Sequence, residues 1–263
     1  MSHRALRWSV SLLLMLSSVC TVLLGMAAGE NRTVWRMQSS DEKVQEPAES
    51  ADGVLEGWTI AVDAGHGGYD GGAVGRKSGV PEKGINLDVA QRLEKMLRAM
   101  GASVVMTRTD DYALCDADPP IRKKLQDMQR RAALIEAGGA QMVLSIHMNE
   151  YAKSSQSGPQ VFYREGCDAG RLLAGVMQEA LIDGLSPARE RSAMSGDFYI
   201  LMLGVPSVLI ECGVLSTPQE EALLLTEAYR QRIAESIAQG VLSWASLDAR
   251  PQALEKRADL QEN

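Results

Sequence analysis

The sequence predicts an α/β protein, a single domain with a mostly parallel, twisted sheet and helices on both faces. Short apolar runs typical of buried strands alternate with segments whose apolar residues recur at helical spacing, and this alternation is the pattern of strand–helix–strand units. The 263 residues are 45% hydrophobic and 23% charged, which suits one sizeable globular domain with appendages.

The first half of the domain is expected to form strand, helix, strand, helix, strand. The first helix has apolar residues at helical spacing and is ended by Gly101, and the second helix is ended by Gly138 and Gly139. These five elements lie at 58–64, 85–100, 102–107, 125–135 and 142–149.

The second half continues the alternation with a short strand at 160–163 and a helix at 173–181. An apolar strand at 208–211 follows, and a closing helix at 233–244 carries apolar residues on one face. No internal repeat is visible, so the pattern indicates one sheet rather than an array of modules.

Three segments outside this domain differ in composition. A basic start precedes an apolar stretch that stays uncharged until Glu30, so residues 1–28 are expected to be a signal peptide or a membrane anchor. Residues 29–56 are polar and charged and are expected to form a disordered linker, and residues 247–263 a charged tail. The folded, catalytic domain would then span 57–246.

The charge and the cysteines count against two classes of protein. A net charge of −7 argues against nucleic acid as a partner, because phosphate binding needs a basic surface. Cys115, Cys167 and Cys212 show no C-x-x-C spacing, so the sequence gives no sign of a zinc ribbon or a redox dithiol. We expect three unpaired cysteines, and one disulfide among them stays open.

Two of the three histidines stand at the ends of strand-like runs. His66 follows the first strand, His147 closes the third, and Glu211 ends the run at 208–211. In an open α/β sheet, side chains at the carboxyl ends of strands converge on one crevice. Two imidazoles and a carboxylate at one edge are the parts of a metal site or an acid/base site.

A hydrolytic zinc site commonly uses two histidines and a carboxylate and leaves a position for water. Glu82 stands at the mouth of the first helix as the third ligand, with Asp63 and Asp70 as competitors. Glycines between positions 65 and 72 would let the backbone pass close to a metal. No Gly-Lys-Ser/Thr follows them, so this is not a phosphate-binding loop.

Glu211 is the natural base to take a proton from water and pass it to a leaving amine. Each assignment has a structural alternative. A histidine at a strand end can simply be hydrogen-bonded, Glu82 can be favoured by a helix dipole, and Glu211 can pair with an arginine. Residue patterns alone therefore leave a zinc hydrolase and a set of structural residues both open.

Four motifs resemble those of zinc-dependent N-acetylmuramoyl-L-alanine amidases, in the family's order and across roughly residues 57–245. They read VDAGHGG at 62–68, EKGINL at 82–87, SIHMN at 145–149 and IECGVLS at 210–216. The resemblance implies that His66, Glu82 and His147 bind Zn²⁺ and that Glu211 is the catalytic glutamate. It also implies hydrolysis of the amide between N-acetylmuramic acid and L-alanine in peptidoglycan.

Other segments are similar to the germination-specific, spore-cortex branch of that family. These are KLQDMQRR at 124–131, SGPQVFY at 157–163 and the region around Arg189. That branch removes peptides so that muramic-δ-lactam can form in cortex peptidoglycan. The last motif departs from the family's usual EVGFLSN at Cys212, Val214 and Thr217, so we expect altered packing beside Glu211.

Some wall amidases carry a long inserted helix that plugs the zinc cleft. Here the interval from His147 to Glu211 already holds a strand, a helix and a short connector. We therefore expect an open cleft with no helix over 185–198 lying across the metal. Control would come from expression, location or an accessory partner that aids zinc binding.

The sequence thus predicts an exported zinc amidase of the cell envelope, secreted or held at the membrane by its N-terminal segment. Its substrate would be cortex peptidoglycan, and Asn149 and Arg189 would contact substrate or support the ligands. The alternatives are a zinc peptidase acting on another wall or peptide amide, and a non-catalytic wall-binding relative. Retention of Glu211 counts against a binding module, which has no need of a base.

Overall fold

The structure, a computed structural model, describes residues 53–116, 122–153 and 155–247. All of them belong to one unit, residues 49–263. The expected export segment, most of the expected linker and most of the charged tail lie outside the described residues. None of the helices in the described part of the chain is long and apolar enough to span a bilayer.

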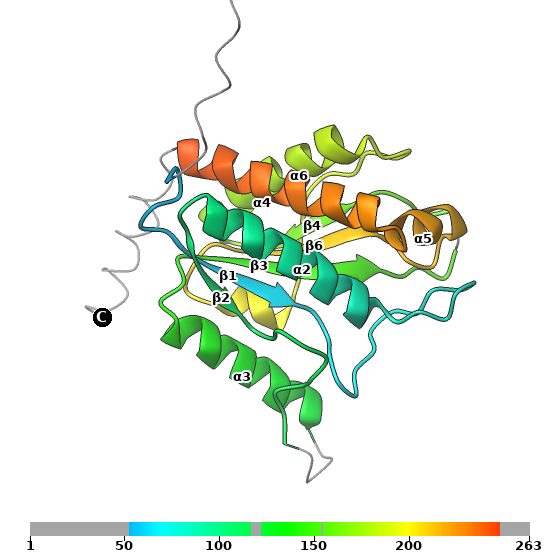
Figure 1. The fold of residues 1–263 in the computed structure, drawn as a ribbon, viewed down its shortest axis with the longest axis horizontal. Coiled ribbons are helices and arrows are strands. Elements are labelled where there is room, and N and C mark those ends of the chain that lie inside the picture. Colours follow the sequence, from blue (N-terminus) through cyan, green and yellow to red (C-terminus); the bar gives the residue numbers. More distant parts are fainter. Residues whose placement is uncertain (1–52, 117–121, 154, 248–263) are drawn as a thin grey trace, which may run out of the picture. The chain divides into compact units, whose positions relative to one another are not determined.

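A six-stranded sheet forms the middle layer of the domain (Figure 1). Three parallel pairings, β2 with β1, β1 with β3 and β3 with β6, make up its centre. β4 runs antiparallel to β6, and β5 pairs parallel to β4. The predicted mostly parallel sheet is confirmed. In sheet order the strands are β2 (Ser103–Met106), β1 (Thr59–Ala64), β3 (Met142–Asn149), β6 (Ser207–Val214), β4 (Gln160–Tyr163) and β5 (Met194–Ser195).

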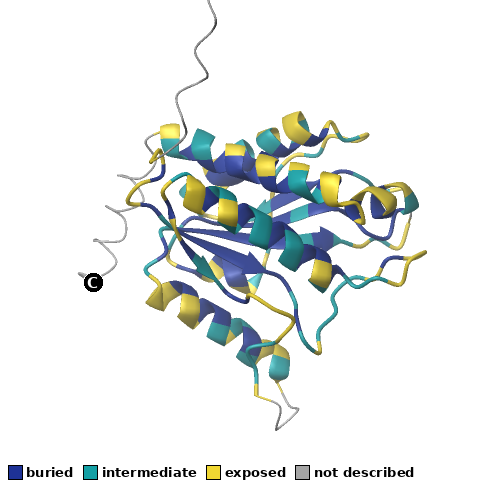
Figure 2. Ribbon diagram, in the orientation of Figure 1, coloured by how far each residue is buried: buried dark blue, intermediate teal, exposed yellow. Residues whose placement is uncertain are grey.

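Helices cover both faces of the sheet, as predicted. Figure 1 shows α2 (Glu82–Ala99), α4 (Asp168–Leu185) and α6 (Glu227–Ser246) on one face and α3 (Lys123–Ala137) on the other. The first three helices enclose the larger apolar core, and Figure 2 shows that their buried sides face the sheet. The smaller core joins α3 to the 3₁₀ helix η1 (Tyr199–Met202).

The apolar spacing located the helices, and local chemistry sets where each one ends. α2 begins at Glu82, before the first apolar residue of its pattern, because a carboxylate in the first turn suits the helix dipole. α4 begins after Cys167, whose Sγ accepts a hydrogen bond from the Gly170 amide. The short elements β5, η1 and α5 (Pro218–Leu224) were not predicted, because they contain too few residues for a periodic pattern.

The domain begins earlier than the sequence predicted. Leu55 was placed in the linker, but its side chain is fully buried in the larger core. Its amide also donates to the carbonyl of Met100 at 2.9 Å. One apolar residue in a polar segment gives no periodicity, so only its contacts show that residues 53–56 belong to the domain.

A buried ion pair between Asp63 of β1 and Arg131 of α3 links the sheet to the helix that covers its second face. Asp63 is the penultimate residue of β1, and its Oδ1 lies 2.7 Å from Nη1 of Arg131 on α3. Both side chains are about 1% exposed. Thr107 and Ser145 also donate hydrogen bonds to the Asp63 carboxylate, at 2.7 and 2.6 Å. The carboxylate of Asp63 therefore links β1 to β3, to the residue that follows β2, and to α3.

Removing this carboxylate is expected to destabilise the fold strongly. Asp63→Ala removes one of the two carboxylates that pair with the buried guanidinium of Arg131 and leaves only Asp127, at 2.7 Å. Breaking a buried ion pair of this kind costs up to about 3–5 kcal/mol of unfolding free energy. Urea unfolding of the purified domain measures the change. The matched control is Asp116→Asn, because Asp116 pairs with the adjacent Arg130 at 2.8 Å on the exposed surface and should change stability little. Equal effects of the two substitutions would contradict the assigned role of the buried pair.

The lowered pKa of Asp63 predicts that the domain becomes less stable in acid. Burial raises the pKa of Asp63, but the charge of Arg131 and the hydrogen bonds from Ser145 and Thr107 outweigh it and hold the pKa at about 2. A lowered pKa stabilises the fold above the unfolded value of 3.8, and that contribution is lost as the pH falls toward 2. Unfolding free energies measured from pH 6 to pH 2 should fall more steeply for the native chain than for Asp63→Asn.

Candidate active site

Four predicted side chains meet at the carboxyl edge of the central strands. His66 follows β1, His147 lies near the end of β3, and Glu211 lies in β6 directly opposite His147 in the strand register. Glu82 reaches the same place from the first residue of α2. The parallel order β1-β3-β6 brings together residues that are far apart in the sequence.

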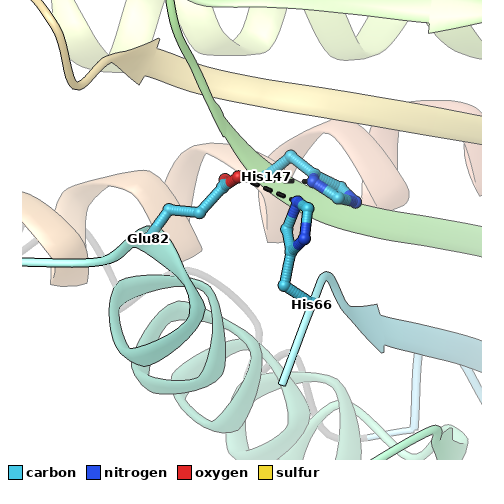
Figure 3. A group of neighbouring side chains, drawn as sticks. All are labelled: His66, Glu82 and His147. Carbon is cyan, nitrogen blue, oxygen red and sulfur yellow. Dashed lines mark ion pairs between the residues drawn. The ribbon is translucent and has the colours of Figure 1, made fainter. Parts of the chain in front are cut away.

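His66, Glu82 and His147 form a cluster with the donor set of a hydrolytic zinc site (Figure 3). One Glu82 oxygen lies 2.8 Å from Nε2 of His66, and the other lies 3.9 Å from Nδ1 of His147. The two imidazole rings are 4.9 Å apart and nearly perpendicular. The three ligand atoms all lie within 4.8 Å of one another, so one cation can contact all three.

Glu82 is held from several directions. Its carboxylate accepts hydrogen bonds from the amides of Ala73 and Met148, at 2.9 and 2.6 Å, and from the Asn86 side chain at 3.2 Å. Two glycines make room for this arrangement. A Cβ at Gly72 would overlap the Glu82 carboxylate, and a Cβ at Gly65 would overlap the His147 ring. The glycine-rich loop therefore lets the backbone approach the ligands, as the sequence predicted.

His66 adopts a left-handed backbone conformation with a φ of 61°, which is unusual for a non-glycine residue. Arg131 donates to its carbonyl oxygen at 2.6 Å and fixes this turn. The Asp70 carboxylate lies 3.0 Å from Nδ1, so Nε2 faces the centre of the cluster. Asp70 contacts the ring nitrogen of His66 that faces away from the cluster, and Asp63 pairs with Arg131. Neither of these competing carboxylates therefore takes the place of Glu82 in the cluster.

The charges of the cluster suit a cation. Burial raises the pKa of Glu82, but the nearby His66 and His147 outweigh it and leave that pKa below its usual value. Burial also lowers the pKa of His147 to about 4, which keeps its imidazole neutral at pH 7. The pKa of His66 is raised, because Glu82 and Asp70 offset its burial. An ionised carboxylate beside a neutral imidazole is the state that metal ligation needs.

Glu211 lies beside the cluster in a different environment. Its Oε2 is fully buried and has no hydrogen-bond partner among the described residues. Burial, together with the charge of Glu82, raises the pKa of Glu211 to about 8, against a smaller opposing effect of His66. No arginine pairs with it in the described part of the chain, so the structural alternative for this residue finds no support. A carboxyl group with this pKa can both accept and donate a proton near neutral pH.

The site opens into a cavity of about 510 Å³. Asn149 lines it and donates to the Tyr151 hydroxyl at 3.3 Å. Arg189 lies elsewhere, where it donates to Gln156, so the structure does not bring it to the cavity. The described residues 186–198 contain no helix, which confirms that no helix in this segment plugs the cleft.

Residues 60–243 match the family model for N-acetylmuramoyl-L-alanine amidase. The chain belongs to the N-acetylmuramoyl-L-alanine amidase family. It is 36% identical over 193 residues to the germination-specific N-acetylmuramoyl-L-alanine amidase of Bacillus subtilis (strain 168), which covers 72% of this chain and 81% of that protein.

Two solved structures of amidases extend the comparison. The CwlD amidase of Clostridioides difficile, in complex with the GerS lipoprotein, is 34% identical with a TM-score of 0.70 over 72% of this chain and 99% of that one. The catalytic domain of CwlV from Bacillus (Paenibacillus) polymyxa var. colistinus is 31% identical with a TM-score of 0.63, covering 71% and 97%. The described domain therefore has the fold of the amidase family.

The departures in the last amidase motif lie away from the cavity. Cys212 and Val214 are fully buried, and neither side chain lines the cavity that contains Glu211. Cys212 packs in the larger core, because alternate residues of a strand point to opposite faces. Cys115, Cys167 and Cys212 are all unpaired in the structure, as expected.

Sequence reasoning missed the residues that support the amidase cluster. Asn86 is fully buried and donates to both Glu82 and the Gly65 carbonyl. Arg131 and Arg108 hold the loop that carries His66 through its carbonyl oxygens. Two signals could have found Asn86: it lies in the EKGINL motif, and it is a polar residue one turn after Glu82 on the same helix face. The arginines gave none, because their partners lie far away in the sequence.

Bound metal should depend on Glu82 more than on Asp70. We expect Glu82→Ala to lose zinc after dialysis, because it removes one of three donors from the cluster. Asp70→Asn should keep zinc but bind it about 10–100-fold more weakly, because Asp70 only orients His66. Metal analysis and chelator competition measure both, with Glu136→Ala on the exposed side of α3 as the control. Full zinc occupancy in Glu82→Ala would show that another residue is the third ligand.

Proposed function

We propose that this chain is a zinc-dependent N-acetylmuramoyl-L-alanine amidase that cleaves the amide between N-acetylmuramic acid and L-alanine in peptidoglycan. The observation that carries this proposal is the unpartnered, buried Glu211 beside the His66–Glu82–His147 cluster, in a chain of the amidase family. A hydrolase needs both parts, since the cluster supplies a cation site and Glu211 supplies a base.

The residues present fit a zinc ion. Two nitrogens and one carboxylate oxygen lie within reach of one point, and two glycines leave space where a side chain would obstruct the ligands. His66, Glu82 and His147 would hold a zinc ion, which would supply Lewis-acid chemistry to polarise the scissile carbonyl and lower the pKa of water. Three protein ligands leave a coordination position free for that chemistry.

Glu211 performs the proton transfers in this proposal. Its carboxylate accepts the proton of the attacking water and then donates it to the nitrogen of the leaving L-alanine. The raised pKa suits both steps, because a group that titrates near the working pH is an efficient acid and base. Burial of Oε2 without a partner leaves that oxygen available for the water proton. Asn149 lines the same cavity and in this proposal contacts the substrate.

We also propose a role in maturation of the spore cortex, where removal of the peptide precedes formation of muramic-δ-lactam. Similarity to the germination-specific amidase of Bacillus subtilis supports this role. The similar CwlD amidase was solved in complex with the GerS lipoprotein, and we propose that this chain likewise has an accessory protein partner. Export through residues 1–28, followed by a linker, would bring the catalytic domain to the wall.

The two alternatives have less support. A non-catalytic wall-binding relative has no use for a buried carboxyl group whose pKa is raised to about 8. A zinc peptidase acting on another amide would need the same cluster, but the chain matches amidases along residues 60–243.

Digestion of purified cortex peptidoglycan tests the proposed reaction. We expect the enzyme to release stem peptides with free N-terminal L-alanine, detected by amino-terminal labelling and mass spectrometry. A chelator should abolish the release and added zinc should restore it, because the cluster is the cation site. Activity that survives complete zinc removal, or cleavage at a different amide, would contradict the proposal.

A substitution of Glu211 separates the base from the metal ligands. Glu211→Gln should keep zinc but lower kcat by about 10²–10⁴-fold, because the amide cannot accept the proton. Zinc content and kcat are measured on the same preparation. The control is Glu136→Gln, an exposed carboxylate on α3 that does not line the cavity. Retention of activity in Glu211→Gln would assign the base elsewhere.

A further inference from the structure

One stretch of the cavity lining takes no part in the proposed metal or proton chemistry. It consists of residues 197–200, where the chain passes from β5 into η1. Tyr199 is 43% exposed although it lines the cavity, and the Asp197 side chain is also exposed. No described residue hydrogen bonds to the Asp197 carboxylate or to the Tyr199 hydroxyl. The cavity wall thus offers a free aromatic face beside a free carboxylate.

This wall is rigidly anchored in the fold. Phe198 packs edge-on against Phe162 of β4, with ring centroids 5.3 Å apart. Ile200 and Leu201 are 2% and 1% exposed and belong to the smaller core. The Gly196 amide donates to the carbonyl of Tyr163 at 2.9 Å. Tyr199 therefore lies between the packed Phe198 and the buried Ile200, and holding its ring in place for a ligand carries a low entropic cost.

The chemistry of this pair fits a sugar. One face of a pyranose ring carries C–H groups that pack against an aromatic side chain, and its rim carries hydroxyl groups that donate to a carboxylate. Ligand sites typically combine an apolar or aromatic surface with a few polar groups that fix orientation. The peptide part of a muramyl peptide offers no equivalent flat, hydroxylated ring.

A second depression continues from the same wall. It has a volume of about 530 Å³, and Asp197 lines both this depression and the active-site cavity. Its lining includes Arg164, Ser195 and Met202, and Met202 is 47% exposed. Two adjacent hollows that share one carboxylate suit a ligand longer than a single sugar.

We propose that Tyr199 and Asp197 form a glycan subsite, and that the sugar strand of peptidoglycan runs from the active-site cavity past Asp197 into the second depression. This inference rests on the proposed amidase function and adds that the enzyme also recognises the glycan strand of its substrate. The ring of Tyr199 stacks on a sugar outside the disaccharide that carries the cleaved amide, and Asp197 accepts hydrogen bonds from the hydroxyl groups of that sugar. The enzyme therefore prefers longer glycan chains to a single disaccharide unit.

Kinetics on substrates of defined glycan length test the subsite. The substrates are a disaccharide and a tetrasaccharide of N-acetylglucosamine and N-acetylmuramic acid, each carrying the stem peptide. Tyr199→Ala should raise KM for the tetrasaccharide about tenfold with little change in kcat, because apolar contact area is lost. Tyr199→Phe should behave like the native chain, since it keeps the ring. Asp197→Asn should also raise KM for the tetrasaccharide more than for the disaccharide.

A binding measurement removes the dependence on turnover. In the Glu211→Gln background, calorimetry with a tetrasaccharide that lacks peptides should detect binding that Tyr199→Ala weakens. Leu172→Ala is the matched control, because Leu172 is 47% exposed on α4 and lines neither hollow. Thermal unfolding of each variant checks that the fold is intact.

The outcomes separate the two proposals. If the native enzyme releases no alanine peptide from either substrate, the proposed function is wrong. If it releases peptide but Tyr199→Ala and Asp197→Asn leave the preference for glycan length unchanged, the glycan subsite is wrong and the amidase function stands. Equal losses for the disaccharide and the tetrasaccharide would also contradict the subsite, because a general defect has no reason to depend on glycan length.

Discussion

The buried pair of Asp63 and Arg131 is the constraint on which the site depends. Asp63 lies near the end of β1 and accepts hydrogen bonds from Thr107 and Ser145, while Arg131 pairs with it from α3. The same guanidinium also holds the carbonyl of His66, whose left-handed turn directs the imidazole into the cavity. An ion pair that costs desolvation energy is thereby used to fix one geometry. This buried polar network fixes the backbone segment that carries the proposed metal ligand His66.

The site also places two glutamates in environments that suit the different roles proposed for them. Glu82 accepts hydrogen bonds from two backbone amides and lies between two imidazoles, so it stays ionised. Glu211 is buried without a partner, so its pKa rises to about 8. An ionised carboxylate is a ligand, whereas a carboxyl group that titrates near neutral pH is an acid and a base. Environment, and not residue type, separates the two functions.

The two apolar cores lie on opposite faces of the sheet and support different parts of the site. The larger core under α2, α4 and α6 holds the central strands in register, which places His147 opposite Glu211. The smaller core carries η1, whose buried residues fix the wall that bears Tyr199. One side of the sheet therefore supports catalytic geometry, and the other side supports the surface proposed to read the glycan. Figure 2 shows the central strands buried between these layers.

Local patterns in the sequence were enough to predict the fold class, the order of the long elements and the residues proposed for the chemistry. Hydrophobic periodicity is a local property, and His66, His147 and Glu211 stand at strand ends that local patterns reveal. Only the tertiary structure decided between the competing carboxylates, because Asp63 and Glu82 differ in their distant partners and not in their own motifs. It also set Arg189 apart from the cavity and placed Leu55 in the core. Contacts between residues far apart in sequence carry no local signal, so burial and pairing had to be seen in three dimensions.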